Sequence, residues 1–138
     1  MTQFRISEAA ALLGVSDDTV RRWSEQGRLT TTRGSNGMQV VEGTELLPVM
    51  AELAAGGALA EAFPVARASA RNRFVGLVTR VQRDGVMAQV DLQAGAFRVV
   101  SLMSREAADE LGLEPGMLAA ASVKATNVTI ELPPGAGA

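Results

Sequence analysis

The chain has 138 residues, of which 47% are hydrophobic, 4% aromatic and 20% charged, and its formal net charge is −2. It contains neither cysteine nor histidine, which excludes disulfides, thiolate or imidazole metal sites, and Ser-His-Asp or Cys-His catalysis. It has no apolar run of about 18 residues and no signal peptide pattern, so we expect a cytoplasmic protein with no membrane partner. Hydroxyls, Arg, Lys and backbone amides remain for binding a small ligand, and such donors suit an anion.

The first third of the chain predicts a helix-turn-helix. Ser7 is a candidate N-cap of a first helix, and Gly14 is suited to end that helix in a left-handed conformation. Ser16 is a candidate N-cap of a second helix, whose buried face is marked by Val20 and Trp23. The opposite face of the second helix is therefore free for a partner.

A β-hairpin and a third helix are predicted next. Residues 29–32 have strand character, residues 34–37 form a turn, and residues 38–41 supply the return strand. The third helix starts near residue 44 and runs to residue 53, with Pro48 in or next to its first turn, where proline is tolerated. These elements make a mainly α-helical, winged helix-turn-helix domain over residues 1–53.

The pattern changes after the third helix. Residues 54–68 are rich in Ala and Gly, which predicts a semi-flexible linker. From Ser69 on, strand-like runs follow at 74–81, 86–92, 97–103, 117–123 and 127–132. Within the first of these runs Gly76 suggests a bend or bulge. A short helix that begins at Ser104 separates the third and fourth runs, and residues 133–138 should be disordered.

Five short strands with one helix between the third and fourth are typical of an OB-like β-barrel. We therefore predict an α+β chain with two domains. The first is the winged helix-turn-helix of residues 1–53, and the second is a five-stranded OB-like barrel with one short helix over residues 69–132.

The segment Val15-Ser16-Asp17-Asp18-Thr19-Val20-Arg21-Arg22-Trp23 is similar to the start of a MerR/excisionase-type helix-turn-helix, and the resemblance extends over residues 4 to 53. It implies operator DNA as a partner. The residues that it implies at the DNA are Ser16, Thr19, Arg21, Arg22 and Arg33. The wing of that family commonly carries a basic run after its glycines, where this chain has Met38-Gln39-Val40. The alternative is a small helical domain whose surface arginines are only solvated.

The segments Ser69-Ala70-Arg71-Asn72 and Val123-Lys124-Ala125-Thr126-Asn127-Val128, with the capped helix between them, resemble the Mop domain, a TOBE-type domain that binds molybdate or tungstate. In that family the oxyanion lies at a subunit interface. The residues that the resemblance implies as its ligands are Ser69, Ala70 (backbone), Arg71, Ser104, Lys124 and Ala125 (backbone), with Ser101 as a weaker candidate. A tetrahedral dianion only accepts hydrogen bonds, so donors and cations fit it, and no metal cation is implied.

Each of these residues also has an ordinary structural interpretation. Ser104 alone is more often only an N-cap, and Lys124 alone is more often a solvated strand residue. Arg71 alone can simply pair with an acid such as Asp91. Only the joint pattern points to an oxyanion.

Together the two resemblances imply a molybdate-responsive transcriptional regulator and not an enzyme. They imply a homo-oligomer, at least a dimer, because the interfacial site of the Mop family does not close within one copy, and single-domain Mop proteins also form hexamers. Regulators of this type commonly carry two Mop copies, whereas this chain has one. Three alternatives remain. The first is a molbindin-like molybdate store whose head, the N-terminal domain of residues 1–53, does not bind DNA. The others are a barrel used only to dimerise, and an excisionase or architectural DNA protein.

Overall fold

The computed structural model describes residues 2–55, 61, 63–64 and 67–135, which divide into two compact units, residues 1–57 and 58–138. Much of the predicted linker, and the end of the predicted disordered tail, lie outside the described residues. No helix in the described ranges is long and apolar enough to cross a membrane.

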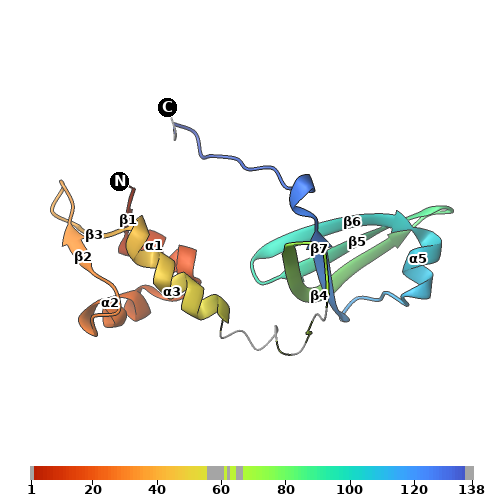
Figure 1. Ribbon diagram of the computed structural model, residues 1–138, viewed down its shortest axis with the longest axis horizontal. Helices are drawn as coiled ribbons and strands as arrows, with labels where there is room; N and C mark the ends of the chain where they lie inside the picture. The colour runs from red at the N-terminus through yellow and green to blue at the C-terminus, as the bar shows by residue number, and fades with distance from the viewer. Residues whose placement is uncertain (1, 56–60, 62, 65–66, 136–138) are drawn as a thin grey trace. The chain divides into compact units, whose positions relative to one another are not determined.

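The N-terminal unit combines three helices with a small sheet (Figure 1). Its elements are β1 (Gln3–Arg5), α1 (Ile6–Leu13), α2 (Asp17–Glu25), β2 (Thr31–Arg33), β3 (Gln39–Glu42) and α3 (Gly43–Ala55). The sheet is antiparallel with the order β1-β3-β2, so the predicted hairpin is confirmed and β1 is an additional strand. The helices and β3 share one core, which includes Val20, Trp23, Val41 and Leu46.

The helix ends confirm two of the three predicted caps. Gly14 ends α1 at a φ of 72°, and the Ser16 Oγ accepts a hydrogen bond from the Thr19 amide at 3.2 Å. The predicted cap at Ser7 is wrong, because α1 begins at Ile6, so that Ser7 lies inside the helix and Arg5, two residues earlier, holds the N-cap position. The Glu8 carboxylate turns back and accepts the Arg5 amide at 2.9 Å, which satisfies the helix start without a serine.

A proline inside α3 also departs from the prediction. Pro48 lies beyond the first turn of a helix that begins at Gly43. Because proline has no amide hydrogen, α3 lacks one backbone hydrogen bond there. Leu46 and Val49 on either side of it are buried, which indicates that packing onto the core holds this helix in place.

The C-terminal unit is a curled four-stranded antiparallel sheet in the form of a half-barrel, with a short helix at one end (Figure 1). The strand order is β6-β5-β4-β7. The elements are β4 (Asn72–Arg83), β5 (Met87–Ala94), β6 (Phe97–Ser104), α5 (Arg105–Glu110), β7 (Leu118–Val123) and a 3-10 turn (Ala125–Asn127). Ser104 caps α5 as predicted, since its Oγ accepts the Ala107 amide at 3.0 Å. The concave face is apolar and surrounds a hollow of about 670 Å³.

The predicted fifth strand is absent, so the prediction of a five-stranded barrel is wrong for a single chain. Residues 128–133 have no regular structure, and Val128, Ile130 and Leu132 are 42%, 86% and 67% exposed. Their alternation with polar residues gives the segment one apolar face, as in a strand. A strand also needs a neighbour for its backbone hydrogen bonds, and within the described residues no strand pairs with this segment.

Asp91 is a buried acid on β5, with only 6% of its surface exposed. One of its carboxylate oxygens accepts hydrogen bonds from Arg98 at 2.7 and 3.1 Å, and the other accepts one from Gln89 at 3.1 Å. These bonds, those from Arg98 first, hold the pKa of Asp91 below its ordinary value. The ionised carboxylate therefore ties β5 to β6.

We expect Asp91→Asn to lower the free energy of unfolding at neutral pH. We also expect the stability of this variant to depend less on pH in the acidic range. Because the pKa of Asp91 is lower in the folded than in the unfolded state, its contribution is fully present above the unfolded value of about 3.9 and is lost as pH falls through the folded value. The difference between parent and variant should thus shrink below about pH 4. Urea unfolding between neutral and acidic pH measures this. Glu110→Gln, on the exposed face of α5, is the control and should leave the pH profile unchanged.

Candidate functional site

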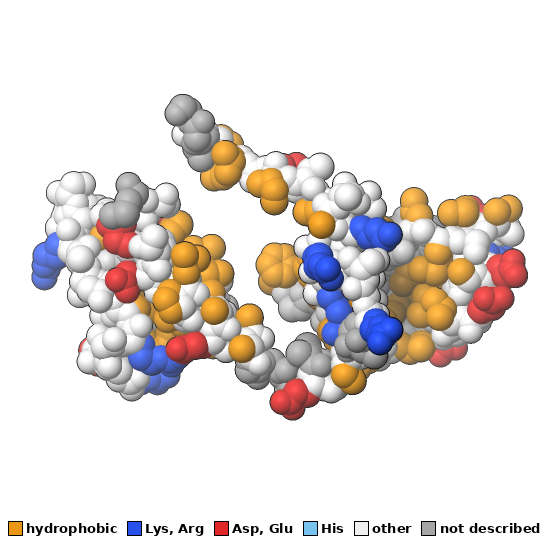
Figure 2. Space-filling view, in the orientation of Figure 1, with side chains coloured by type: hydrophobic (Ala, Val, Ile, Leu, Met, Phe, Trp, Pro, Cys, Tyr) orange, Lys and Arg blue, Asp and Glu red, His pale blue; other side chains and the backbone are white. Residues whose placement is uncertain are grey.

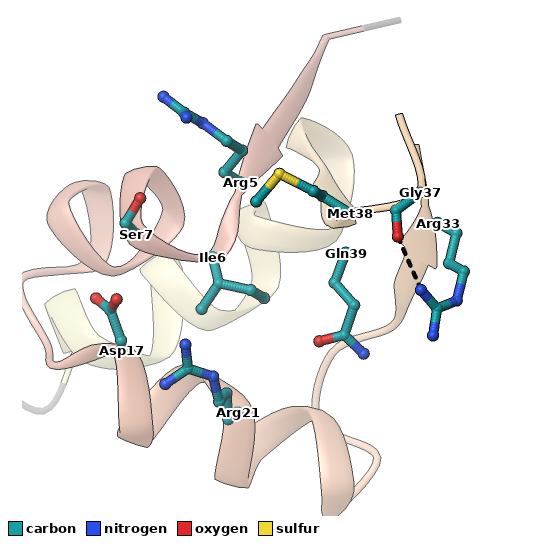
Figure 3. Close-up of a pocket in the computed structure, with 9 residues that line it drawn as sticks. All are labelled: Arg5, Ile6, Ser7, Asp17, Arg21, Arg33, Gly37, Met38 and Gln39. Atoms are coloured by element: carbon teal, nitrogen blue, oxygen red, sulfur yellow. Dashed lines mark hydrogen bonds between the residues drawn. The ribbon is translucent and has the colours of Figure 1, made fainter. Parts of the chain in front are cut away.

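One candidate surface lies on the N-terminal unit, where the start of α2 faces the β2–β3 hairpin. The two elements and the start of α1 surround a hollow of about 390 Å³ (Figure 3). The lining residues are Arg5, Ile6, Ser7, Asp17, Arg21, Arg33, Gly37, Met38 and Gln39. Three guanidinium groups therefore border one hollow, against the single carboxylate of Asp17.

None of these three arginines is held by a strong ion pair, so their guanidinium groups remain available to bind an anion. The Arg21 guanidinium is 3.2 Å from the Asp18 carboxylate, and that of Arg5 is 3.2 Å from Glu8. Both pairs are exposed, and exposed ion pairs contribute little, about 0–1 kcal/mol. Arg33 donates to the Gly37 carbonyl at 2.8 Å and has no carboxylate partner among the described residues. Phosphates can replace such partners at little cost.

The structure brings together only part of the predicted DNA-contacting set. Arg21 and Arg33 line the same hollow, whereas Arg22 is exposed but does not line it. The hydroxyls of Ser16 and Thr19 lie 2.9 Å apart at the start of α2, where they hydrogen-bond to each other. Arg5 joins the surface and was missed by the sequence analysis. The sequence feature that could have identified Arg5 is its position at the start of a helix, where the helix dipole disfavours positive charge.

A second candidate site lies at one end of the sheet in the C-terminal unit. Asn72 of β4 pairs with Val123 of β7, and its side-chain amide donates to the Val123 carbonyl at 3.1 Å. Arg71 directly precedes Asn72, and Lys124 directly follows Val123. Two cations that are distant in sequence therefore lie beside each other at the ends of neighbouring strands. Ser69 and Ala70 precede Arg71, and Ala125 follows Lys124. Lys and Arg side chains (blue) gather on this side of the unit, whereas Asp and Glu (red) gather near α5 (Figure 2).

Neither cation of this pair is neutralised by an acid in the described part of the chain. Arg71 has one weak contact, at 3.5 Å to the Ala68 carbonyl, and Lys124 takes part in no ion pair there. The alternative in which Arg71 pairs with Asp91 is wrong, because Asp91 is held by Arg98. Neighbouring Arg73 differs, since its guanidinium donates to the Phe63 carbonyl and stacks 4.8 Å from the Phe63 ring.

Ser104 lies far from the two cations within one chain. It pairs with Met87 at the start of β5, whereas Arg71 and Lys124 lie beyond the opposite end of the sheet. Its Oγ accepts from the Ala107 amide, so the hydroxyl hydrogen remains free to donate. Ser101 pairs with Val90 and lines the apolar hollow. The described residues contain no group of three or more His, Cys, Asp or Glu side chains that could hold a metal ion.

Two family models match this chain, one in each of its two compact units. Residues 5–38 match the model of the MerR family regulatory protein, and residues 68–130 match the TOBE domain model. Molybdenum-pterin-binding protein 2 of Clostridium pasteurianum is 38% identical over 63 residues, which are 45% of this chain and 93% of the relative. The chain belongs to the TOBE (Mop) family. In this chain a MerR-type helix-turn-helix precedes a single TOBE domain. Both matched families are binding or regulatory families rather than catalytic ones.

Solved structures that are similar to about half of this chain include three proteins. MopII from Clostridium pasteurianum has 36% identity, a TM-score of 0.45, and coverage of 48% of this chain and 100% of its own. A molybdate-binding protein from Sporomusa ovata has 26% identity, a TM-score of 0.46, and coverage of 48% and 98%. The cytoplasmic molybdate-binding protein ModG, with molybdate bound, has 36% identity, a TM-score of 0.47, and coverage of 54% and 51%.

Proposed function

We propose that this protein is a cytoplasmic DNA-binding transcriptional regulator whose TOBE domain binds molybdate or tungstate. One observation carries the proposal. A MerR-type helix-turn-helix is joined to a TOBE domain in which Arg71 and Lys124 adjoin each other in strand register, without a carboxylate partner in the described ranges.

The chemistry of this end of the sheet suits a tetrahedral oxyanion. Arg71 and Lys124 supply positive charge, Ser69 supplies a hydroxyl, and the backbone amides of Ala70 and Ala125 are additional donors. A dianion of this shape has only acceptor atoms, so a nearby carboxylate would repel it. The curated relative is named for binding molybdenum-pterin, which supports a molybdenum-containing ligand.

A second copy of the chain completes the proposed site. Ser104 is a ligand of the site only if it comes from another copy, because it lies at the opposite end of its own sheet. The exposed apolar alternation of residues 128–132 and the open edges of β6 and β7 offer a means of association, since an extended segment can add to a free sheet edge. The assembly is thus a homo-oligomer, a dimer or a larger closed assembly such as a hexamer.

The proposed DNA contacts belong to the surface between α2 and the hairpin. Arg21 and Arg33 meet the phosphate backbone there, joined by Arg5, while Ser16, Thr19 and Arg22 extend the contact along α2. The net charge of residues 1–37 is only +1, from five arginines and four acids, so one head alone binds DNA weakly. Oligomerisation through the TOBE domain pairs two heads and thereby doubles the contact.

The proposal is tested by binding the full chain to DNA from upstream of its own gene, with and without molybdate. We expect molybdate to change DNA affinity by about five- to 150-fold, and DNA to change molybdate affinity by the same factor, because coupling between two sites is reciprocal. Gel shifts measure the first factor and calorimetry the second. Tungstate should replace molybdate, and the Lys124→Ala variant should bind DNA but not respond.

Two outcomes would contradict the proposal in different ways. If calorimetry detects tight molybdate binding but saturating molybdate leaves DNA affinity unchanged, the two domains act independently and the molbindin-like store is favoured. If sulfate gives the same heat and the same response as molybdate, the site is a general oxyanion site and the proposed ligand is wrong.

A further inference from the structure

Among the side chains around the hollow of the N-terminal unit, Gln39 is the one primary amide. It is exposed, and no hydrogen bond of its side chain is found within the described residues. In Figure 3 it extends from β3 into the space between the hairpin and α2, on the side where Arg21 lies. The arginines supply charge, which attracts every DNA sequence alike, so Gln39 has a different chemical role available to it.

The backbone holds Gln39 in a fixed position. It begins β3, the central strand of the sheet, and pairs with Arg33 of β2. Val40, the next residue, is 8% exposed, so β3 is anchored to the unit directly behind Gln39. The anchored strand fixes the backbone from which the amide extends, so only the freedom of the side chain itself is lost on binding, and a fixed backbone position favours recognition of one base.

The neighbouring side chain favours one base pair. A glutamine amide offers one donor and one acceptor, and this pair matches N7 and the N6 amino group of adenine. Met38, the residue before Gln39, lines the same hollow and is 53% exposed, and in Figure 3 its side chain extends toward Arg5, apart from the amide. The thymine methyl group is the apolar feature of the major groove, and it belongs to the same base pair as adenine.

We propose that Gln39 is a sequence-determining residue that recognises the adenine of an A·T pair in the major groove, with Met38 against the thymine methyl group. This inference rests on the proposed DNA binding and deepens it. The arginines around the hollow position the backbone, and Gln39 selects the base. The segment Met38-Gln39-Val40 lacks the basic residues common in such wings. Its role is therefore base recognition in place of phosphate contact.

The test selects binding sites for the full chain from a library of random DNA duplexes. The parent should enrich sites with A·T at one fixed position, and Gln39→Ala should lose that preference, by about five- to 150-fold, at this position only. Gln39→Glu has the same shape but only accepts hydrogen bonds, so it should shift the preference to cytosine. Arg33→Ala is the control, and it should weaken binding to all sites and reduce the salt dependence by about one unit.

Replacing the selected adenine by 7-deazaadenine removes only the N7 acceptor. The parent should lose affinity for this DNA, whereas Gln39→Ala should not distinguish it from normal DNA. If the parent enriches a defined site and Gln39→Ala enriches the same one, the role of Gln39 is overturned while DNA binding stands. If the parent enriches no sequence and no DNA binds, the proposed function fails as well.

Discussion

Lys124→Ala should weaken molybdate binding by well over tenfold and leave the fold intact. Truncating one partner of a charged, desolvated hydrogen-bonded pair typically costs about 2–5 kcal/mol. Lys124 is exposed and makes no ion pair in the described part of the chain, so its truncation removes no contact that the fold uses. Calorimetric titration with molybdate measures the loss. Arg80→Ala, which removes an exposed cation from the middle of β4, is the matched control and should bind as the parent does.

A mixing experiment separates a shared site from a site within one chain. Ser104→Asp keeps a good helix N-cap but places a carboxylate beside the oxyanion, so this variant should also bind poorly. If Lys124 of one copy and Ser104 of another hold the same ligand, mixed oligomers of the two variants contain sites in which both residues are intact. For randomly mixed dimers about a quarter of the sites should regain parental affinity. No recovery after denaturation and co-refolding would show that the two residues do not share a site.

Gly76→Ala should strongly destabilise the C-terminal unit. A Cβ atom at this position would lie 2.1 Å from the Gln93 carbonyl oxygen and 2.8 Å from the Ala94 Cα. Both are backbone atoms at the end of β5, so they cannot rotate away as a side chain would. Overpacking costs about 1–3 kcal/mol and here should reach the upper part of that range, a loss of about 10 °C or more in melting temperature.

The measurement is thermal unfolding of the full chain followed by far-ultraviolet circular dichroism. The single tryptophan, Trp23, lies in the core of the other unit, and its fluorescence should report an unchanged head. Gly85→Ala is the matched control, because a Cβ there meets no atom within 4 Å. A melting temperature for Gly76→Ala as high as that for Gly85→Ala would show that β4 can move away from β5.

The sequence predicted Gly76 as a point of irregularity but not its cause. The break in register between β4 and β5 falls between Val78 and Arg80, so the bulge is not at the glycine. Gly76 is instead a point of close backbone approach. Such an approach depends on where the last residues of β5 run, and no local pattern in β4 contains that information.

Local chemistry was enough for most of the elements. Ser16, Gly14 and Ser104 act as caps through hydrogen bonds and dihedral angles that span a few residues, so their neighbours in sequence specify them. The buried face marked by Val20 and Trp23 follows from helical periodicity alone. The family resemblance rests on the same short-range motifs, and the comparisons confirm it for both parts of the chain.

Only the tertiary structure decided which of the predicted site residues meet. Strand register brings Arg71 beside Lys124 and leaves Ser104 at the far end of the sheet, and register is set by pairing between distant segments. The same reason explains the missing fifth strand. The sequence determined an alternating apolar face over residues 128–132, but whether that face forms a strand depends on a free sheet edge. The sheet has edge strands in β6 and β7, but within one chain residues 128–132 pair with neither of them.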